Sequence, residues 1–372
     1  MHSLNYHSLY LHVPFCRNIC DYCVLYSVVS KDQDQRQAYF DQMIKHLERN
    51  SKQLQELETI FIGGGTPTQP SVEELRPFFQ AIKDNVTLKE NYEFSVECNP
   101  STVTKEKLEL LKEFGVNRLS FGAQSSSRST RKTLGRRTTH EQLIEVVEMA
   151  SSLGFEDLNV DLIYAVPGQE LEDWQGDLEL MMELPINHLS AYSLIIEEGA
   201  ALSKRIHEVD DDLAVDMYEL AGDFLTKRGF ERYEISNYSK SGKQCRHNLD
   251  IWLGKTYLGI GPAAASFDGE RRWNEIADLA KWLDGSDLIY DDMPREERAG
   301  EVVAFGFRTN RGWKETELDF WYSFSDWREM RAFEYLFEEG LLIAEDGYIR
   351  ATERGLLFAD TIAEEVMFNT GG

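Results

Sequence analysis

The sequence predicts an α/β protein: a partial (β/α)6 barrel, an irregular covering segment and a small C-terminal winged-helix-like α+β domain. Six strand-like runs alternate with amphipathic helical patterns over the first 230 residues, and short connections between such elements are typical of a parallel sheet. Each run carries its unusual polar residues at its end, as strands do at the mouth of a barrel. Beyond residue 296 a helix, a hairpin and a further helix follow.

The barrel prediction depends on the order of these runs. They lie at residues 8–15, 59–65, 92–100, 117–125, 157–168 and 188–199. Ser71 and Thr139 each begin an S/T-x-x-E/Q capping box, which marks the start of a helix between two runs. Gly115 and Gly154 stand where helices are expected to end. A doubly wound parallel sheet is the alternative to the barrel.

The same patterns divide the chain into three regions. Residues 1–230 form the predicted barrel, and residues 296–372 form the C-terminal helix-hairpin-helix module, in which Asp346-Gly347 predicts a tight turn. Residues 231–295 lose any regular period and are rich in Gly, Asn, Tyr and Trp. We expect this middle region to cover the site.

The charge balance excludes some partners. The chain has 39 basic and 65 acidic residues, a formal net charge of -26 at pH 7, which repels phosphate backbones and anionic lipids. We therefore expect no nucleic-acid partner. No apolar stretch is long enough to cross a membrane, and the first residues lack the pattern of a secretory signal. These features predict a cytoplasmic protein that is not integral to a membrane.

Three of the five cysteines form the motif C-x3-C-x2-C: Cys16, Cys20 and Cys23. Three thiolates on one short loop can each bind one iron of a [4Fe-4S] cluster and leave the fourth iron open to a small molecule. Zinc is the alternative, although structural zinc sites usually take four ligands. Cys98 and Cys245 stand alone, and we expect both to be buried and inert.

The cysteine motif after the first strand, together with the glycine-rich GGGTPT at residues 63–68, resembles the radical S-adenosylmethionine (SAM) superfamily. In that superfamily the open iron binds SAM, and an electron from the cluster cleaves it. The resemblance therefore implies a [4Fe-4S] cluster on Cys16, Cys20 and Cys23, SAM as a cofactor, and an electron donor if SAM is cleaved.

Further motifs resemble the oxygen-independent coproporphyrinogen III oxidase family. They are Tyr10-Leu-His-Val-Pro-Phe-Cys16, Gly122-Ala-Gln-Ser125, Leu134-Gly-Arg136, Asn159-Val-Asp-Leu162, Pro167-Gly-Gln169, Tyr233-Glu-Ile-Ser-Asn237 and Arg246-His-Asn248. By this resemblance a first SAM contacts Tyr10, Gly65 and Glu97. A second SAM site, known from the oxidase, implies contacts with Tyr22, Thr66, Gln124, Arg136 and Asp161. A salt bridge between Arg136 and Asp161 that closes the barrel mouth is the structural alternative for these two residues.

Within this family the chain resembles the heme chaperone branch. Leu25 stands where the oxidase has an additional cysteine, and the chain reaches Tyr10 without the longer N-terminal arm of the oxidase. The branch has an H-N-x-x-Y-W motif associated with heme, and here the motif begins at His247 and ends at Trp252, with Ile251 in place of the tyrosine. The resemblance implies that His247 and Trp252 bind heme. A histidine fixed in a packed turn is the alternative.

These resemblances imply a radical SAM protein of heme metabolism, a heme chaperone that binds heme and delivers it to heme-accepting apo-proteins. The enzymatic alternative is a coproporphyrinogen dehydrogenase, which converts coproporphyrinogen III to protoporphyrinogen IX by oxidative decarboxylation. A radical methyl or adenosyl transfer that opens heme is a third possibility. The sequence leaves open whether SAM is cleaved, and it assigns no catalytic residue.

Overall fold

The structure, a computed structural model, describes residues 5–368 and confirms the predicted order of strands and helices. The six barrel strands are hydrogen-bonded neighbours in a parallel arrangement. They are β1 (Ser8–Val13), β2 (Leu57–Gly64), β3 (Leu88–Cys98), β4 (Arg118–Gln124), β5 (Asp157–Tyr164) and β6 (His188–Ser193). Each strand overlaps the run that predicts it, because the alternation of buried and cavity-facing positions is a local property of the sequence.

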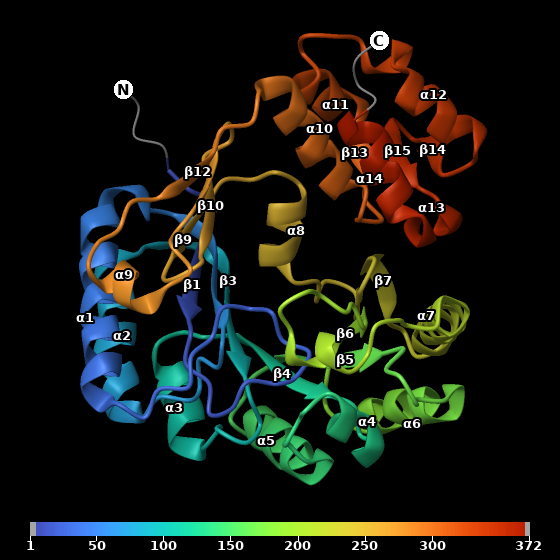
Figure 1. Ribbon diagram of the computed structural model, residues 1–372. Coiled ribbons are helices and arrows are strands. Elements are labelled where there is room, and N and C mark those ends of the chain that lie inside the picture. Colours follow the sequence, from blue (N-terminus) through green and yellow to red (C-terminus); the bar gives the residue numbers. More distant parts are fainter. Residues whose placement is uncertain (1–4, 369–372) are drawn as a thin grey trace.

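Helices cover the outer side of these strands (Figure 1). They are α1 (Gln33–Asn50), α2 (Val72–Asn85), α3 (Lys105–Glu113), α4 (Arg128–Thr133), α5 (His140–Ser152), α6 (Leu171–Met182) and α7 (Asp211–Thr226). The predicted capping boxes are present at Ser71 and Thr139, where each side chain accepts a hydrogen bond from the backbone of the first helical turn. The apolar faces of these helices and strands form the main hydrophobic core.

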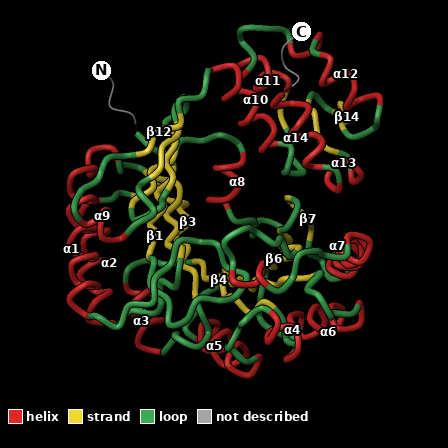
Figure 2. Tube along the Cα trace, viewed as in Figure 1, coloured by secondary structure: helices red, strands yellow, loops and turns green. Residues whose placement is uncertain are grey.

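The sheet continues beyond the barrel strands at both edges and stays open over the described residues, in the order β12-β11-β10-β9-β1-β2-β3-β4-β5-β6-β8-β7. The added strands are β7 (Glu231–Glu234), β8 (Asn237–Ser239), β9 (Tyr257–Ile260), β10 (Ala265–Phe267), β11 (Arg272–Asn274) and β12 (Ile289–Asp291). Strand β9 runs parallel to β1, and β8 runs antiparallel to β6. Figure 2 shows these short strands, in yellow, in line with the barrel strands.

Residues 231–295 are therefore more regular than the sequence predicts. Their strands are only three or four residues long, so they carry no visible period. Strands β9 and β8 nevertheless pair with β1 and β6, whose edges would otherwise be exposed, and the other short strands extend the sheet from them. Helices α8 (Arg246–Trp252) and α9 (Leu279–Leu283) belong to the same region, and α8 lies between the barrel and the C-terminal module (Figure 1).

The C-terminal module contains a small antiparallel sheet and confirms the predicted helix-hairpin-helix pattern. Its helices are α10 (Arg295–Gly306), α11 (Glu315–Trp321), α12 (Arg331–Glu338), α13 (Glu353–Leu357) and α14 (Ala359–Phe368); its strands are β13 (Trp313–Lys314), β14 (Leu342–Glu345) and β15 (Tyr348–Ala351). Asp346 and Gly347 both have positive φ, 52° and 76°, as the predicted tight turn requires. A second hydrophobic core fills this module, and the residue boundaries of the three regions stay predictions.

Three short 3-10 helices complete the secondary structure of the described residues: Ser51–Gln53, Ala201–Lys204 and Trp327–Glu329. No helix within residues 5–368 is long and apolar enough to cross a membrane.

Candidate functional site

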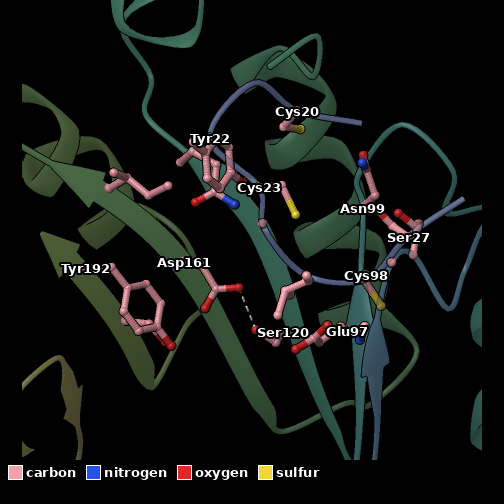
Figure 3. A pocket seen from close by; sticks show the side chains of 18 of the residues that line it. Cys20, Tyr22, Cys23, Ser27, Glu97, Cys98, Asn99, Ser120, Asp161 and Tyr192 are labelled. Atoms are coloured by element: carbon pink, nitrogen blue, oxygen red, sulfur yellow. Dashed lines mark hydrogen bonds between the residues drawn. The ribbon is translucent and has the colours of Figure 1, made fainter. Parts of the chain in front are cut away.

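A cavity of about 560 Å³ lies among the carboxyl ends of the barrel strands, the loop after β1, and α8. Figure 3 shows Cys20, Tyr22 and Cys23 on that loop, with Asp161, Ser120 and Glu97 on the strands beside them. The structure brings almost all of the predicted site residues to this cavity: Tyr10, Cys16, Cys20, Tyr22, Cys23, Gly65, Thr66, Glu97, Gln124, Arg136, Asp161 and His247. Trp252 does not line it.

Backbone hydrogen bonds fix the cysteine loop. The N–H of Cys16 donates to the carbonyl of Val28 over 2.9 Å, and the N–H of Val28 donates to the carbonyl of Pro14 over 2.8 Å. The N–H of Asp21 donates to the carbonyl of Leu134 over 3.0 Å, which ties the middle of the loop to the segment after α4. These bonds close the loop at its base and hold it at Asp21. Its three cysteines line the cavity.

The three thiols of this loop are half-buried and form no disulfide. Burial raises the pKa of Cys16 and of Cys23, so a bound cation is needed to favour their thiolate forms. Arg136 donates from Nη1 to Sγ of Cys20 over 3.7 Å. Three soft donors on one loop fit three corners of a [4Fe-4S] cluster. Within residues 5–368, no group of three His, Cys, Asp or Glu side chains is arranged to hold a single metal ion.

The glycine-rich turn after β2 packs directly against this loop. A Cβ atom on Gly65 would lie 2.6 Å from the carbonyl of Pro14, so only glycine allows this approach. The N–H of Gly65 donates to the carbonyl of Val13 over 2.9 Å. Next to it, Oγ1 of Thr66 lies 3.5 Å from Sγ of Cys16. The turn therefore brings both backbone and hydroxyl groups to the first cysteine.

Glu97 ends β3 and faces the same turn. Its Oε2 accepts a 3.1 Å hydrogen bond from the N–H of Gly64, and a Cβ atom on Gly63 would lie 3.0 Å from its carboxyl group. Burial, together with the nearby charge of Asp161, raises the pKa of Glu97 to about 8. Near neutral pH this carboxyl group is therefore largely protonated, and it can donate a hydrogen bond to a ligand.

Tyr10 reaches the cavity from β1 through a buried histidine. Its hydroxyl lies 3.1 Å from Nδ1 of His12, whose Nε2 lies 2.8 Å from the carbonyl of Tyr26. A carbonyl only accepts, so Nε2 carries the proton and Nδ1 accepts from the tyrosine hydroxyl. Burial lowers the pKa of His12, which keeps the imidazole neutral. His12 thereby sets the direction of the Tyr10 hydroxyl.

The ends of β4 and β5 supply the amide and carboxylate of the predicted second SAM site. Gln124 has a φ of 71°, a left-handed conformation that is rare for residues other than glycine and that accompanies a register shift between the two strands. Asp161 accepts hydrogen bonds from Oγ of Ser120 over 2.9 Å and from Nδ2 of Asn159 over 2.7 Å. Burial raises the pKa of Asp161.

Arg136 does not form the salt bridge with Asp161 that is the structural alternative. Its Nη2 donates to the carbonyl of Gly122, its Nη1 points to Cys20, and its buried Nε has no partner among the described residues. The guanidinium is thus directed by the cysteine loop and by the backbone of β4. Asp161 and Arg136 remain free to contact different parts of a ligand.

A buried hydrogen-bond chain that the sequence analysis does not anticipate orients Asn159. The N–H of Cys245 donates to the hydroxyl of Tyr233 over 3.2 Å, so this hydroxyl donates in turn to Nε2 of His188 over 2.7 Å. The other ring nitrogen, Nδ1, then donates to Oδ1 of Asn159 over 2.6 Å. This chain turns the NH2 of Asn159 toward Asp161. Tyr233 lies in one of the motifs shared with the oxidase family, whereas no motif marks His188.

His247 lies on the cavity side of α8 and is 2% exposed. Its Nδ1 lies 2.8 Å from Oγ1 of Thr59, and that hydroxyl donates to Ser8, so Nδ1 carries the proton. The lone pair of Nε2 therefore has no partner among the described residues. Burial lowers the pKa of His247 to about 3, and the ring of Phe61 stacks on it at 5.0 Å.

Trp252 lies on another side of the same helix. Five helical residues after His247 correspond to a rotation of about 140°, whereas Ile251, four residues on, shares the face of His247 and lines the cavity. The ring of Trp252 instead packs 5.8 Å from Phe305 and beneath the guanidinium of Arg308, on the side of the C-terminal module. The structure thus does not bring the two predicted heme residues to one cavity.

The sequence analysis did not select several residues that line the cavity, although the alternation along β4 could have indicated some of them. Arg118, Ser120, Gly122 and Gln124 alternate along β4 and line the same wall, as a period of two requires. The sequence analysis selected only the last of these side chains. By contrast, Glu197, a polar residue near the end of the sixth run, is exposed and does not line the cavity.

Comparison with known proteins finds relatives that match most of the chain. The model of the Radical SAM superfamily matches residues 10–181. The heme chaperone HemW of Bacillus subtilis is 32% identical over 95% of this chain and 97% of its own length. HemW of Lactococcus lactis is 34% identical over 80% of this chain and 77% of its own length, and HemW of Escherichia coli is 36% identical over 69% of each.

A solved structure shares the whole fold. Coproporphyrinogen III oxidase (HemN) from Escherichia coli, a radical SAM enzyme, superposes with a TM-score of 0.85 at 20% identity, and the match covers 98% of this chain and 91% of the oxidase. This likeness extends to the C-terminal module and establishes the architecture described above.

Proposed function

We propose a function for this chain from its family: it belongs to the HemW family of the radical SAM superfamily. In this proposal the protein is a heme chaperone that binds heme and delivers it to heme-accepting apo-proteins. The observation that carries the proposal is the 32% identity to a heme chaperone over 95% of this chain and 97% of the relative. We further propose that it works in the cytoplasm, where free thiols stay reduced.

Membership of the radical SAM superfamily implies a [4Fe-4S] cluster and SAM as cofactors. We assign the cluster to Cys16, Cys20 and Cys23, because these thiols share one loop and one cavity wall. When bound, the cluster supplies the electron for reductive cleavage of SAM, and an external electron donor has to restore it. The chain itself holds the cluster loop closed, and it places the guanidinium of Arg136 beside Sγ of Cys20.

The SAM contacts follow from the walls of the cavity. Tyr10, Gly65 and Glu97 lie on the side of β1 to β3, and we assign them to a SAM bound at the cluster. The remaining set lies on the cysteine loop, the glycine-rich turn, strands β4 and β5 and the segment after α4, and we assign it to a second SAM or to another ligand of similar chemistry. It consists of Tyr22, Thr66, Gln124, Arg136 and Asp161.

An apolar rim supports heme as the cargo. Ile19, Val24 and Leu25 of the cysteine loop and Ile195 after β6 line the cavity and are exposed, Ile195 by 70%. Exposed apolar side chains around a cavity are typical of binding sites for large apolar ligands, and a tetrapyrrole face would bury them. Leu25, which stands in place of the extra cysteine of the oxidase, is part of this rim.

We propose His247 as the iron ligand. Its neutral imidazole presents the lone pair of Nε2, which is the form that binds heme iron. The surrounding protein covers this atom, so iron binding requires a shift of α8 or of the histidine ring. Trp252 distinguishes two possible binding positions of heme. A heme in the cavity would not contact Trp252, whereas a heme on the outer side of α8 would.

The test is a heme titration of the anaerobically reconstituted protein, followed by addition of an apo-heme protein as acceptor. We expect saturable heme binding with a shifted Soret band, and transfer of heme to the acceptor. His247→Ala is expected to weaken binding, while Trp252→Phe is expected to leave it unchanged if heme enters the cavity. A protein with full cluster content that binds no heme would refute the chaperone function.

The oxidase alternative is tested in the same preparation. The protein is incubated with SAM, a reductant and coproporphyrinogen III, and both products are followed by liquid chromatography. We expect no protoporphyrinogen IX. Its formation together with 5′-deoxyadenosine over many turnovers would replace the chaperone proposal with the oxidase.

A further inference from the structure

Arg118 is a buried cation without a hydrogen-bond partner. It opens β4, lines the cavity and is only 4% exposed. Within residues 5–368 its guanidinium makes no hydrogen bond and no ion pair within 4 Å, although the carboxylates of Glu93 and Asp161 act on its charge through space. Gln124 ends the same strand at the mouth, so the rise of about 3.3 Å per residue places the backbone of Arg118 roughly 20 Å deeper along the strand.

The carboxylate of Glu93, on the neighbouring strand β3, is committed elsewhere. Its Oε2 accepts from the N–H of Arg246 over 2.8 Å, and its Oε1 accepts from the N–H of His247 and from Oγ of Ser95, each over 3.2 Å. Glu93 therefore caps the N-terminus of α8, where a negative charge is favoured. It acts on the charge of Arg118 through space but accepts no hydrogen bond from the guanidinium.

The other acidic groups of the cavity do not hydrogen-bond to Arg118 either. Asp161 accepts hydrogen bonds from Ser120 and Asn159, and Glu97 accepts from the glycine-rich turn. The carboxylates of Asp161 and Glu93 stabilise the charge of Arg118 through space, but its N–H donors have no acceptor among the described residues.

Buried N–H donors without an acceptor cost free energy, so a ligand that supplies an acceptor is favoured at this position. Guanidinium presents its N–H donors as a planar fork that matches the two oxygens of a carboxylate. We propose that Arg118 is the binding residue for a carboxylate group of a ligand in this cavity. This inference rests on the proposed function, whose two ligands both carry carboxylates: the propionates of heme and the methionyl end of SAM.

The position of Arg118 favours a propionate. The groups assigned to a SAM at the cluster lie around the cysteine loop and the glycine-rich turn, whereas Arg118 stands at the start of β4. Ser120 follows two residues along the same face, and Asn159 pairs with Ser120 on β5, so uncharged donors adjoin the guanidinium. A flexible propionate arm that extends from the macrocycle toward the start of β4 would meet this set.

The experiment compares Arg118→Gln and Arg118→Lys with the wild type and with Arg128→Gln, an exposed control on α4. The reconstituted proteins are titrated with heme, with heme dimethyl ester, which lacks carboxylates, and with SAM. We expect Arg118→Gln to weaken heme binding about tenfold, as for loss of a charge-assisted hydrogen bond. Arg118→Lys is expected to be intermediate, because it keeps the charge without the fork, and ester binding is expected to be the same in all four proteins.

The remaining outcomes separate the sources of the carboxylate. Weaker SAM binding with unchanged heme binding would confirm the carboxylate subsite and assign it to SAM. Unchanged affinity for both ligands in a folded Arg118→Gln protein would overturn the proposal. If that variant does not fold, Arg118→Lys decides, and wild-type affinities for both ligands would overturn it. A wild type that binds no heme would refute the chaperone function, while the SAM titration still tests Arg118.

Discussion

The N–H of Gly64 donates a hydrogen bond of 3.1 Å to Oε2 of Glu97, and this contact joins the ends of β2 and β3 at the cavity. Gly64 has a φ of 106°, and a Cβ atom there would lie 2.6 Å from the ring of His12. The hydrogen bond therefore depends on a residue without a side chain. Because His12 also directs the hydroxyl of Tyr10, one backbone conformation positions two of the groups assigned to SAM.

Gly64→Ala is expected to lower the free energy of unfolding by about 2–4 kcal/mol, because it adds left-handed strain to a steric clash with His12. Gly168→Ala is the matched control: its φ is 85°, but no atom lies within 4 Å of the added Cβ. We expect it to cost only about 1 kcal/mol. Urea unfolding of both variants measures the difference, and equal losses would show that His12 does not restrict position 64.

Glu97→Gln is expected to change how stability depends on pH. The pKa of Glu97 is raised from 4.5 to about 8, so the folded state holds the proton more tightly than the unfolded state does. Between these values the wild type therefore loses stability as the pH rises, whereas glutamine has no proton to lose. We expect the stability of the variant relative to the wild type to increase from pH 5 to pH 8, by at most about 1.4 kcal/mol per pH unit.

Urea unfolding of the apoprotein at several pH values measures this effect. Glu172→Gln, an exposed position on α6, serves as the control and is expected to show no such trend. A stability difference between Glu97→Gln and wild type that stays constant over this pH range would contradict the raised pKa.

Cys20→Ser is expected to abolish the brown iron–sulfur absorption of the reconstituted protein, because a hydroxyl is a poor ligand for cluster iron. Cys98→Ala is the informative control, since Cys98 also lines the cavity but stands on β3 and donates to the carbonyl of Val96 over 3.6 Å. We expect it to keep its iron and sulfide. Normal iron and sulfide in the Cys20 variant, measured chemically, would disprove the ligand assignment.

His247→Ala is expected to weaken heme binding about tenfold and to leave the cluster intact, because the proposed ligand lies on α8 and not on the cysteine loop. His207→Ala, at an exposed position, controls for nonspecific binding of heme to histidine. Heme titrations followed at the Soret band measure both variants. Equal affinities of His247→Ala and wild type would mean that iron is bound elsewhere.

Much of the fold could be predicted because its signals are local. The capping box at Ser71 and the hairpin turn at Asp346-Gly347 depend on a few neighbouring residues, and both are present. The strands of residues 231–295 were not visible, because three or four residues carry too short a pattern. Their pairing depends on β1 and β6, which are distant in the sequence.

The candidate site divides in the same way. The residues selected from motifs meet at one cavity, apart from Trp252, which the helical rotation of α8 turns toward Phe305. The hydrogen-bond chain from Tyr233 through His188 to Asn159 could not be predicted from the sequence, because it joins three separate strands. No spacing in the sequence records that these side chains meet.

The sequence by itself determined the cysteine motif, the order of the barrel elements and the family, because these reside in short motifs and their order. Only the tertiary structure decided that Arg136 points to Cys20 and not to Asp161, and that Arg118 is buried beside the cavity without a hydrogen-bond partner among the described residues. The physical reason is that hydrogen bonding and the burial of charge depend on which strands become neighbours, and packing of the whole chain sets that arrangement.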